Sequence, residues 1–442
     1  MEKIKLFGGR DIEIELPPPG LHIEEAVPPK NVILPLSDKG RRAYRLLVQK
    51  GEMVSQGERI GEASNHSMPP IHSPISGKVT DIKDVRYPEG ANILSLFIES
   101  DGKEQWKTNL VPCENYMERA PEELMGIVRN AGVEIIPLET LPYHKRSAST
   151  SPSVRYLVIN GIGHSFGEAI VRQLLVERSR DLLDGIRLAQ RILQTEKVYL
   201  AVDKKHEDAI QSVMDSGLET YAEIVKLDVY YPLGYPNLLF KRIFGKEIPS
   251  PHGDAIDMGA AFTNVDSILH AFDAIKQGKP QLKTYMSVNG GAIQTPKNLK
   301  VHIGTPLKEI IDLCGGLKER PGRIILGTPL DGSAQLSLES PILKDTRWLW
   351  VQPEKSVVTD KYRACIGCGD CVDICPVKVM PNFLGKFCEF GKYQEAADQY
   401  DLFTCIECGL CAYVCPSRRP IVHFIRLGKW ELSLEEKENA GK

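Results

Sequence analysis

Eight cysteines in the last quarter of the chain stand in two runs with the same spacing. Residues 365–376 read CIGCGDCVDICP and residues 405–416 read CIECGLCAYVCP. Each run is C-x2-C-x2-C-x3-C followed by proline, a spacing with which thiolates hold iron–sulfur clusters. In two-cluster ferredoxins the fourth cysteine of a run binds the cluster of the other run. The chemistry that these residues predict is one-electron transfer.

This exchange of fourth ligands predicts two [4Fe–4S] clusters. Site 1 takes Cys365, Cys368, Cys371 and Cys415, and site 2 takes Cys405, Cys408, Cys411 and Cys375. Glycines at 367, 369 and 409 let backbone amides approach the sulfur atoms and donate hydrogen bonds to them. Structural zinc is the weaker alternative, because zinc sites use two separated cysteine pairs rather than two complete runs that each end in proline.

Three cysteines lie outside these runs. Cys113 and Cys314 stand alone, and Cys388 lies between the runs at no ligand spacing. We expect all three to be small buried packing residues, with substitute ligation by Cys388 as the minor alternative. A disulfide framework is excluded as the main interpretation, because it would spread its cysteines over a small secreted domain.

Composition restricts the class of protein. The chain has 442 residues, 42% hydrophobic and 26% charged, with a net charge of −3. This is the profile of a folded soluble protein of about three domains, and it gives no reason to expect nucleic-acid binding. No run of about 18 apolar residues predicts a membrane span, and acidic residues stand where a signal peptide would have its apolar core. We therefore expect a cytoplasmic protein that meets a membrane through partners.

The elements that must position the cysteines begin with β structure. Residues 1–30 are extended and proline-rich, which predicts an arm rather than a helix. Residues 31–117 contain short strand patterns with turn glycines and resemble a biotinyl/lipoyl-type β-sandwich. A carrier domain of that type has a lysine at an exposed hairpin tip. The sequence MPPIHSP stands at the comparable place, so we expect a scaffold.

The patterns in the remaining three quarters of the chain predict three further units. Residues 118–283 alternate between strand and helix patterns, including the strands RYLVIN and KVYLAVD and a strongly helical stretch over 166–195, which predicts an α/β core. Residues 284–350 return to strands around a short helix that ends at Cys314. Residues 351–442 hold both cysteine runs. The 29 residues between Cys375 and Cys405 contain one helical pattern, KYQEAADQYDLF, and another begins between Val414 and Lys429.

Taken together, these segments resemble the RnfC family, the C subunits of the Rnf electron-transport complex. The resemblance is carried by FGG at 7–9, KGEMVSQGERIGEA, HSPISGKV, YPLGYPNLL, the segment from SVNGGAIQTPKNLKVHIGTP to LCGG, and CIECGLCAYVCPS. It implies a multidomain α/β fold. The order is a β-sandwich, a core similar to the flavin subunit of respiratory complex I, a β-grasp (soluble-ligand-binding) domain over 284–350 and a helical two-cluster ferredoxin domain over 351–442.

The resemblance also implies a role. Members of the family are peripheral subunits on the cytoplasmic face of the membrane that take electrons from NADH through FMN and pass them on to membrane partners. The expected partners are therefore the other subunits of a redox complex, together with NADH or an electron-donor protein.

The sequence departs from the family where flavin is held. Flavin-binding members carry a glycine-rich loop after a segment like IVRNAG, because backbone amides can cradle phosphate only where glycine permits close approach. Here IVRNAG is followed by VEIIPLETLPYHKR, with no glycine from 133 to 160. Gly161, Gly163 and Gly167 form a weak substitute phosphate loop, and His164 between them has no visible partner. We expect a tight strand–helix turn there, which disfavours FMN without closing the question.

Three functions remain in view. The favoured one is an electron-transfer subunit that passes single electrons through two [4Fe–4S] clusters and has lost flavin and NADH binding. The first alternative is an FMN-dependent, NADH-oxidising subunit of an Rnf-type ion-translocating complex. The second is an assembly scaffold with structural clusters. No catalytic residue is predicted, and the donor, the acceptor and the cluster potentials are not encoded in any visible motif.

Overall fold

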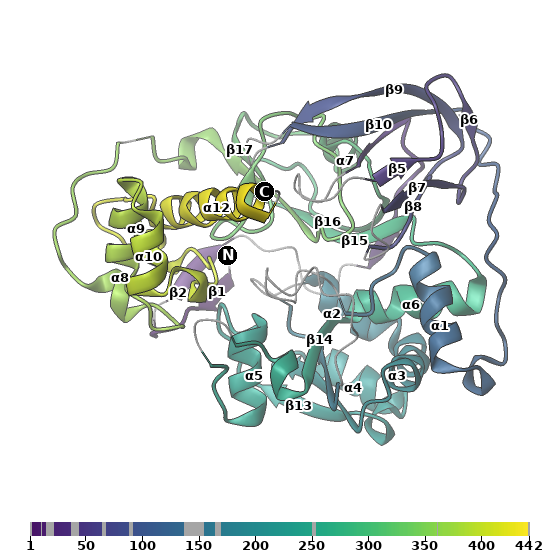
Figure 1. The fold of residues 1–442 in the computed structure, drawn as a ribbon, viewed down its shortest axis with the longest axis horizontal. Coiled ribbons are helices and arrows are strands. Elements are labelled where there is room, and N and C mark those ends of the chain that lie inside the picture. Colours follow the sequence, from purple (N-terminus) through teal and green to yellow (C-terminus); the bar gives the residue numbers. More distant parts are fainter. Residues whose placement is uncertain are drawn as a thin grey trace.

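The computed structural model describes residues 2–9, 11–14, 22–36, 44–63, 68–87, 92–136, 154–163, 169–249, 253–359 and 361–440. Four units follow one another in the order that the sequence predicts. The N-terminal β-sandwich and the β-grasp domain lie side by side over the α/β core, and the helices of the C-terminal domain flank them on one side (Figure 1). Within the described ranges, no helix has the length and apolar character needed to cross a membrane.

The N-terminal unit is a sandwich of two antiparallel sheets. One has the strand order β4-β10-β9-β6 and the other β5-β7-β8. Alternate apolar side chains of both sheets, among them Val32, Ile60 and Leu96, form the core between them. The strands are β4 Asn31–Pro35, β5 Tyr44–Leu46, β6 Met53–Val54, β7 Arg59–Ala63, β8 Ile71–His72, β9 Gly77–Arg86 and β10 Asn92–Ser100.

The α/β core is built on a parallel sheet with the order β13-β12-β11-β14. Both faces are buried, because Leu157 and Ile159 of β11 pack into one apolar cluster and Val158 packs into another on the opposite face. The strands are β11 Tyr156–Asn160, β12 Lys197–Asp203, β13 Glu223–Leu227 and β14 Ala260–Asn264. The helices are α1 Pro121–Asn130, α2 Ala169–Glu177, α3 Ser179–Leu193, α4 Glu207–Asp215, α5 Pro236–Phe244 and α6 Val265–Gln277, with short 3-10 turns at Tyr116–Glu118, Leu218–Thr220 and Ile256–Met258.

The strongly helical stretch over 166–195 is two helices rather than one. The chain breaks at Arg178, whose φ of −125° and ψ of 26° lie outside the helical region. Its guanidinium bonds Asp181 and Asp273, with Nη2 at 2.8 and 2.7 Å from the two carboxylates. A helical pattern gives no warning of this break, because one of the two carboxylates that hold it, Asp273, comes from α6, 95 residues away.

The β-grasp domain has a mixed sheet with the order β18-β17-β19-β15-β16-β3, packed against α7. Its edge strand β3 belongs to the N-terminal arm and pairs in parallel with β16. Its strand β19 runs three residues past the boundary expected at 350. The elements are β3 Ile23–Glu25, β15 Lys283–Asn289, β16 Lys297–His302, α7 Leu307–Leu313, β17 Pro321–Leu326, β18 Ser333–Ala334 and β19 Trp348–Pro353, followed by a 3-10 turn at Glu354–Ser356.

The rest of the described arm forms a hairpin beside the C-terminal domain. Strands β1 (Glu2–Lys5) and β2 (Asp11–Ile14) pair antiparallel. A Cβ built on Gly8 in their turn would lie 3.1 Å from Ile374 Cδ1, so the turn touches the first cysteine run. The described part of the arm contains no helix, as expected: it forms this hairpin, and its strand β3 completes the edge of the β-grasp sheet.

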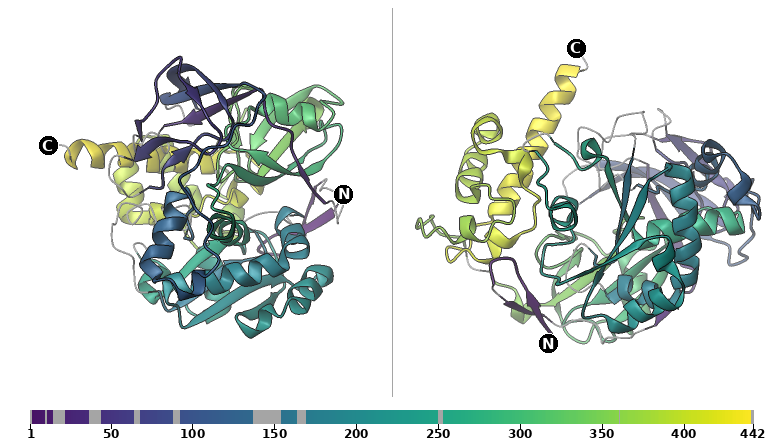
Figure 2. Two further views of the ribbon diagram at one scale, coloured as in Figure 1. Left: turned by 90° about the vertical axis from the view of Figure 1, so that its right-hand side faces the viewer. Right: turned by 90° about the horizontal axis from the view of Figure 1, so that it is seen from below.

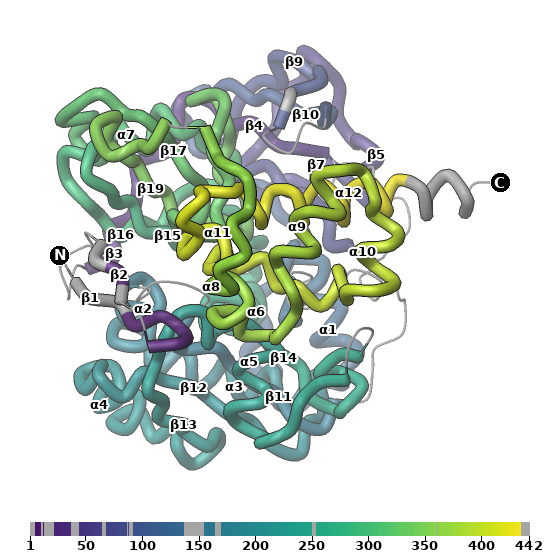
Figure 3. The backbone as a smooth tube through the Cα atoms, turned by 90° about the vertical axis from the view of Figure 1, so that its left-hand side faces the viewer, coloured from purple at the N-terminus to yellow at the C-terminus, as the bar shows by residue number. Residues whose placement is uncertain are grey.

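The C-terminal domain is helical, and the side view in Figure 3 shows α8 and α11 near the middle of the molecule, with α9, α10 and α12 outside them. Helix α12 extends beyond the body of the protein (Figure 2). It begins at Ile421, within the stretch 414–429 where the sequence predicts the start of a helix, whereas the sequence pattern did not predict α9. The helices are α8 Asp370–Asp373, α9 Pro381–Glu389, α10 Tyr393–Tyr400, α11 Leu410–Tyr413 and α12 Ile421–Ala440, with a 3-10 turn at Leu402–Thr404.

The three isolated cysteines differ in burial. Cys314 ends α7 with no exposed surface, and Cys388 on α9 is 1% exposed, so the expectation of buried packing residues is confirmed for both. Cys113 is only partly buried, at the edge of the α/β core. A Cβ built on Gly428 of α12 would lie 2.5 Å from Cys388 Sγ. The glycine and the thiol therefore let α9 and α12 pack closely.

We expect Gly428→Ala to lower the free energy of unfolding of the C-terminal domain by about 1–3 kcal/mol, the usual cost of forcing a methyl group into a filled contact. The matched variant Cys388→Ala removes the obstructing sulfur, and it should retain full iron content because this cysteine lines neither cluster pocket. In the double variant, Gly428→Ala should lower the free energy of unfolding by less than it does in the parent chain. Thermal melting of the four proteins measures this coupling; strict additivity would contradict the packing described.

Candidate metal centres

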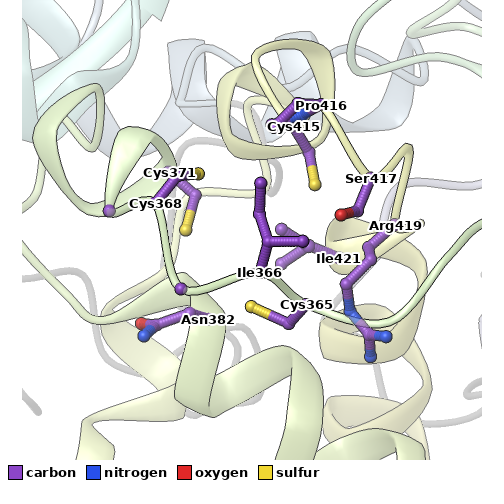
Figure 4. Close-up of a pocket in the computed structure, with 12 residues that line it drawn as sticks. Cys365, Ile366, Cys368, Cys371, Asn382, Cys415, Pro416, Ser417, Arg419 and Ile421 are labelled. Carbon is purple, nitrogen blue, oxygen red and sulfur yellow. The ribbon is translucent and has the colours of Figure 1, made fainter.

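Site 1 is formed by two segments that approach each other from opposite sides. Cys365 and Cys368 lie on the loop before α8, Cys371 lies on α8, and Cys415 follows α11. All four line one pocket of about 430 Å³, open solvent included. Figure 4 shows Cys415 reaching this space from one segment and Cys365, Cys368 and Cys371 from the other. The pocket lies at the surface, because Cys365 and Cys368 are exposed.

Site 2 has the same construction with the roles of the segments reversed. Cys405 and Cys408 lie on the loop before α11, Cys411 lies on α11, and Cys375 follows α8. These four line a second pocket, of about 310 Å³. Helices α8 and α11 contact each other, which brings the fourth cysteine of each run to the pocket of the other run. Each set of four that the spacing predicts is therefore gathered around one pocket.

The shape of the two pockets bears on the kind of metal that would fit. Within the part of the chain that the structure describes, no three His, Cys, Asp or Glu side chains converge closely enough to hold a single metal ion. The cysteines instead surround a space, which is the arrangement that a cubane requires, because each thiolate binds a different iron atom. The donor set, four thiols at each pocket, also suits iron–sulfur chemistry.

Burial and backbone amides act against each other on the thiols. Burial raises the pKa of Cys375, while N–H groups of Val377, Val379 and Lys378 lower it by donating to the sulfur. Burial likewise raises the pKa of Cys408 to about 12, against the N–H of Leu410. The amides thus favour the thiolate form that binds metal, and a bound metal would have to supply the remaining positive charge.

The two sites differ in their surroundings. Ile366, between the first two ligands of site 1, is 70% exposed. Site 2 instead borders an apolar cluster to which several units contribute, including Leu6 of the arm, Tyr231 of the core and Trp348 of the β-grasp domain. Site 1 therefore faces outward, and site 2 faces the rest of the chain.

Two contacts fix site 2 to the other domains, and no sequence motif predicted either. The Tyr231 hydroxyl donates a hydrogen bond of 2.7 Å to the Cys408 carbonyl. A Cβ on Gly409 would lie 2.1 Å from the Leu330 carbonyl oxygen, so the β-grasp loop lies directly on the second cysteine run. In the sequence, the segment YPLGYPNLL supported only the family resemblance.

The weak phosphate-loop candidates lie elsewhere, after β11. Gly161 donates its N–H to the Ala201 carbonyl at 2.9 Å, and a Cβ there would lie 2.5 Å from the same oxygen. This glycine is therefore explained by close packing of β11 and β12. Gly163 has a φ of +75°. Gly167 and His164 lie outside the described residues, as do residues 137–153, where the family's glycine-rich loop would fall.

Comparison with protein families assigns four segments in the order of the four units. An RnfC barrel sandwich hybrid domain matches residues 19–103, a Nuo51 FMN-binding domain matches 129–273, an SLBB domain matches 285–333 and a 4Fe-4S dicluster domain matches 364–418. These matches confirm the fold class expected from the sequence.

Whole-chain relatives have one description in common. The C subunit of the proton-translocating ferredoxin:NAD(+) oxidoreductase complex of Clostridium ljungdahlii is 34% identical over 92% of this chain and 90% of its own length. Its Na(+)-translocating counterpart from Acetobacterium woodii is 28% identical over 93% of both chains. A solved NAD+-reducing [NiFe]-hydrogenase in its H2-reduced state aligns with a TM-score of 0.47 at 14% identity, over 71% of this chain and 63% of that chain. On the strength of the relatives, the chain belongs to the RnfC family, the C subunits of ion-translocating oxidoreductase complexes.

Proposed function

We propose that the chain is an electron-transfer subunit that holds a [4Fe–4S] cluster at each of sites 1 and 2 and passes single electrons between a donor and another subunit. The observation that carries the proposal is the grouping of eight cysteines around two neighbouring pockets, with the fourth thiol of each run exchanged. When bound, each cluster supplies a centre that accepts and releases one electron. The chain's own residues hold, insulate and orient these centres.

Site 1 is suited to exchange with a partner protein. Two of its ligands, Cys365 and Cys368, are exposed, and the apolar side chain of Ile366 projects between them. Contact with a partner would cover this surface and exclude water from the path between the two proteins. We infer that the partner is another subunit of the complex, because the relatives are named as subunits of multi-subunit oxidoreductases.

Site 2 is suited to exchange with the inside of the assembly. It borders the arm, the α/β core and the β-grasp domain, so an electron that enters through any of these units meets site 2 before site 1. The loop between β13 and α5, which contains Tyr231, connects site 2 to the sheet of the core, because Asn160 at the end of β11 donates a hydrogen bond of 3.0 Å to the Gly234 carbonyl. Those contacts support a path from the core through site 2 to site 1, or its reverse.

A second candidate function keeps the flavin. The Nuo51 FMN-binding match over 129–273 favours it, and the named relatives are ferredoxin:NAD(+) oxidoreductase subunits. The sequence from 133 to 160 argues against it, because it contains no glycine with which to cradle a phosphate group. We favour the form without flavin, in which a donor protein rather than NADH supplies the electrons.

We further propose that the chain works at the cytoplasmic face of a membrane and is held there by other subunits. No helix among the described residues supplies a membrane span of its own. The relatives translocate protons or sodium ions as complexes, a task for which membrane subunits are required.

Cofactor analysis of the chain purified without oxygen tests the proposal. We expect about eight iron atoms and eight sulfides per chain, as two cubane clusters require, and no flavin. One FMN per chain would instead favour the second candidate function, in which the chain keeps its flavin. About four iron atoms, or zinc in place of iron, would contradict the assignment of two clusters. Clusters that no donor of any potential reduces would leave only an assembly role.

A further inference from the structure

Glu407 is an unusual residue for its position. The two cysteine runs correspond residue by residue, and Glu407 stands where the first run has Gly367. Both have positive φ, +71° for the glycine and +58° for the glutamate. A side chain in this left-handed region costs conformational energy that glycine avoids. The contacts of the Glu407 carboxylate show what offsets this cost.

The carboxylate binds two cations from one helix. Glu407 accepts hydrogen bonds from Arg426 Nε at 3.1 Å and from Lys429 Nζ at 2.8 Å. Both cations lie on one face of α12, three residues apart, and we call the three residues the Glu407 network. These two ion pairs, at 3.1 and 2.8 Å, favour the ionised carboxylate.

The network is attached to the ligand backbone of site 2. Lys429 Nζ also donates to the carbonyl of Cys405 at 2.6 Å, and the N–H of Glu407 lies 3.4 Å from Cys405 Sγ. Arg426 Nη2 donates to the Asp331 carbonyl at 2.6 Å, so the same network reaches the β-grasp loop. The side chains of Glu407 and Lys429 are 33% and 19% exposed, so water screens their charges only in part.

The charges around site 2 can be compared with those around site 1. Besides the network, one further carboxylate, Asp331, and one further cation, Lys378, act electrostatically on the ligands Cys408 and Cys375. Three cations thus face two carboxylates. At site 1 the lining residue Arg419 is paired with Glu389, one charge against one. By this count the charges around site 2 leave one positive charge in excess, whereas the ion pair at site 1 is balanced.

One electron added to a site makes it more negative by one charge. A nearby cation stabilises that reduced form and raises the reduction potential, and a nearby carboxylate lowers it. We propose that the Glu407 network sets the reduction potential of site 2, with Lys429 raising it and Glu407 offsetting part of that rise. The inference rests on the proposed function, since it requires a cluster at site 2.

The test is an anaerobic redox titration of the whole chain, followed by electron paramagnetic resonance, on Lys429→Met and Glu407→Gln. Lys429→Met should lower the potential of site 2 and Glu407→Gln should raise it. Each should change the ratio of reduced to oxidised protein at a fixed potential by roughly tenfold, or about 59 mV for a one-electron couple. The potential of site 1 in the same samples is the internal control and should stay within the error of the titration.

Shifts of opposite sign in the two variants distinguish control of the reduction potential from a purely structural role of the network. If the network only clamps α12, both substitutions should disturb site 2 alike, and shifts of the same sign or no shift would overturn the inference. Glu407→Gly, which copies Gly367 and removes the backbone cost, should raise the potential as Glu407→Gln does. If the unmodified chain shows no second cluster, the proposed function has failed instead.

Discussion

Cys375→Ala is expected to eliminate the cluster at site 2 and leave the cluster at site 1 intact. Cys375 belongs to the first run in sequence, but it lines the pocket of Cys405, Cys408 and Cys411. Loss of one of four thiolates opens the coordination of one iron atom in a partly apolar pocket. The iron content should fall from about eight to about four per chain. The complementary variant Cys415→Ala should lose site 1, since Cys415 lines the other pocket.

The two variants decide whether the fourth ligands are exchanged. If each run held its own cluster, Cys375→Ala would destroy site 1 and Cys415→Ala would destroy site 2. The sites can be told apart by the Glu407→Gln substitution, which should move the potential of site 2 alone. Cys314→Ala is the matched control, because Cys314 is buried in the β-grasp domain and lines neither pocket. It should keep about eight iron atoms.

The second large effect is expected from Gly409→Ala. Gly409 has a φ of +78°, and an added methyl group would lie 2.1 Å from the Leu330 carbonyl oxygen. The left-handed backbone alone costs an alanine about 1–2 kcal/mol. The collision with backbone adds roughly 1–3 kcal/mol more, because neither segment can move without displacing the other. The β-grasp loop should be pushed away from site 2, with a lower melting temperature and loss of iron from that site.

The equivalent glycine of the first cysteine run supplies the control for this prediction. Gly369 occupies the same position in the first run, with a φ of +85°, and an added Cβ would meet nothing within 4 Å. Gly369→Ala should therefore show only the backbone cost and keep both clusters. Equal losses in the two variants would show that the contact with Leu330 does not support site 2. Thermal melting and iron analysis of both proteins, prepared side by side, make the comparison.

The metal sites could be predicted from local sequence, because the spacing of the cysteines largely decides which thiolates can face the same cluster. Three thiolates two residues apart must lie on one face of a cluster, and the fourth, three residues on, is turned away from it. The assignment of ligands to sites remains a prediction, although the pockets group the same residues. The β-sandwich and the α/β core were also predictable, since strand and helix patterns there are regular and turn glycines separate them.

Features set by distant contacts could not be predicted. The strand β3 pairs with β16, almost three hundred residues away, and the break at Arg178 depends on Asp273. The surroundings of site 2 also depend on contacts between residues distant in sequence, because Tyr231 and Leu330 reach it from other domains. Glu407 was visible in the sequence as the odd member of the repeat, and a comparison of the two runs would have singled it out.

The two clusters are the centre of the proposed activity, which includes no flavin although the Nuo51 FMN-binding match covers the core. An anaerobic titration of the purified chain, followed by absorbance and electron paramagnetic resonance, tests this most directly. A strong chemical reductant should reduce two one-electron centres, and NADH alone should change nothing. Bleaching of a flavin band by NADH, followed by reduction of the clusters, would contradict the proposal and establish the chain as the NADH-oxidising subunit.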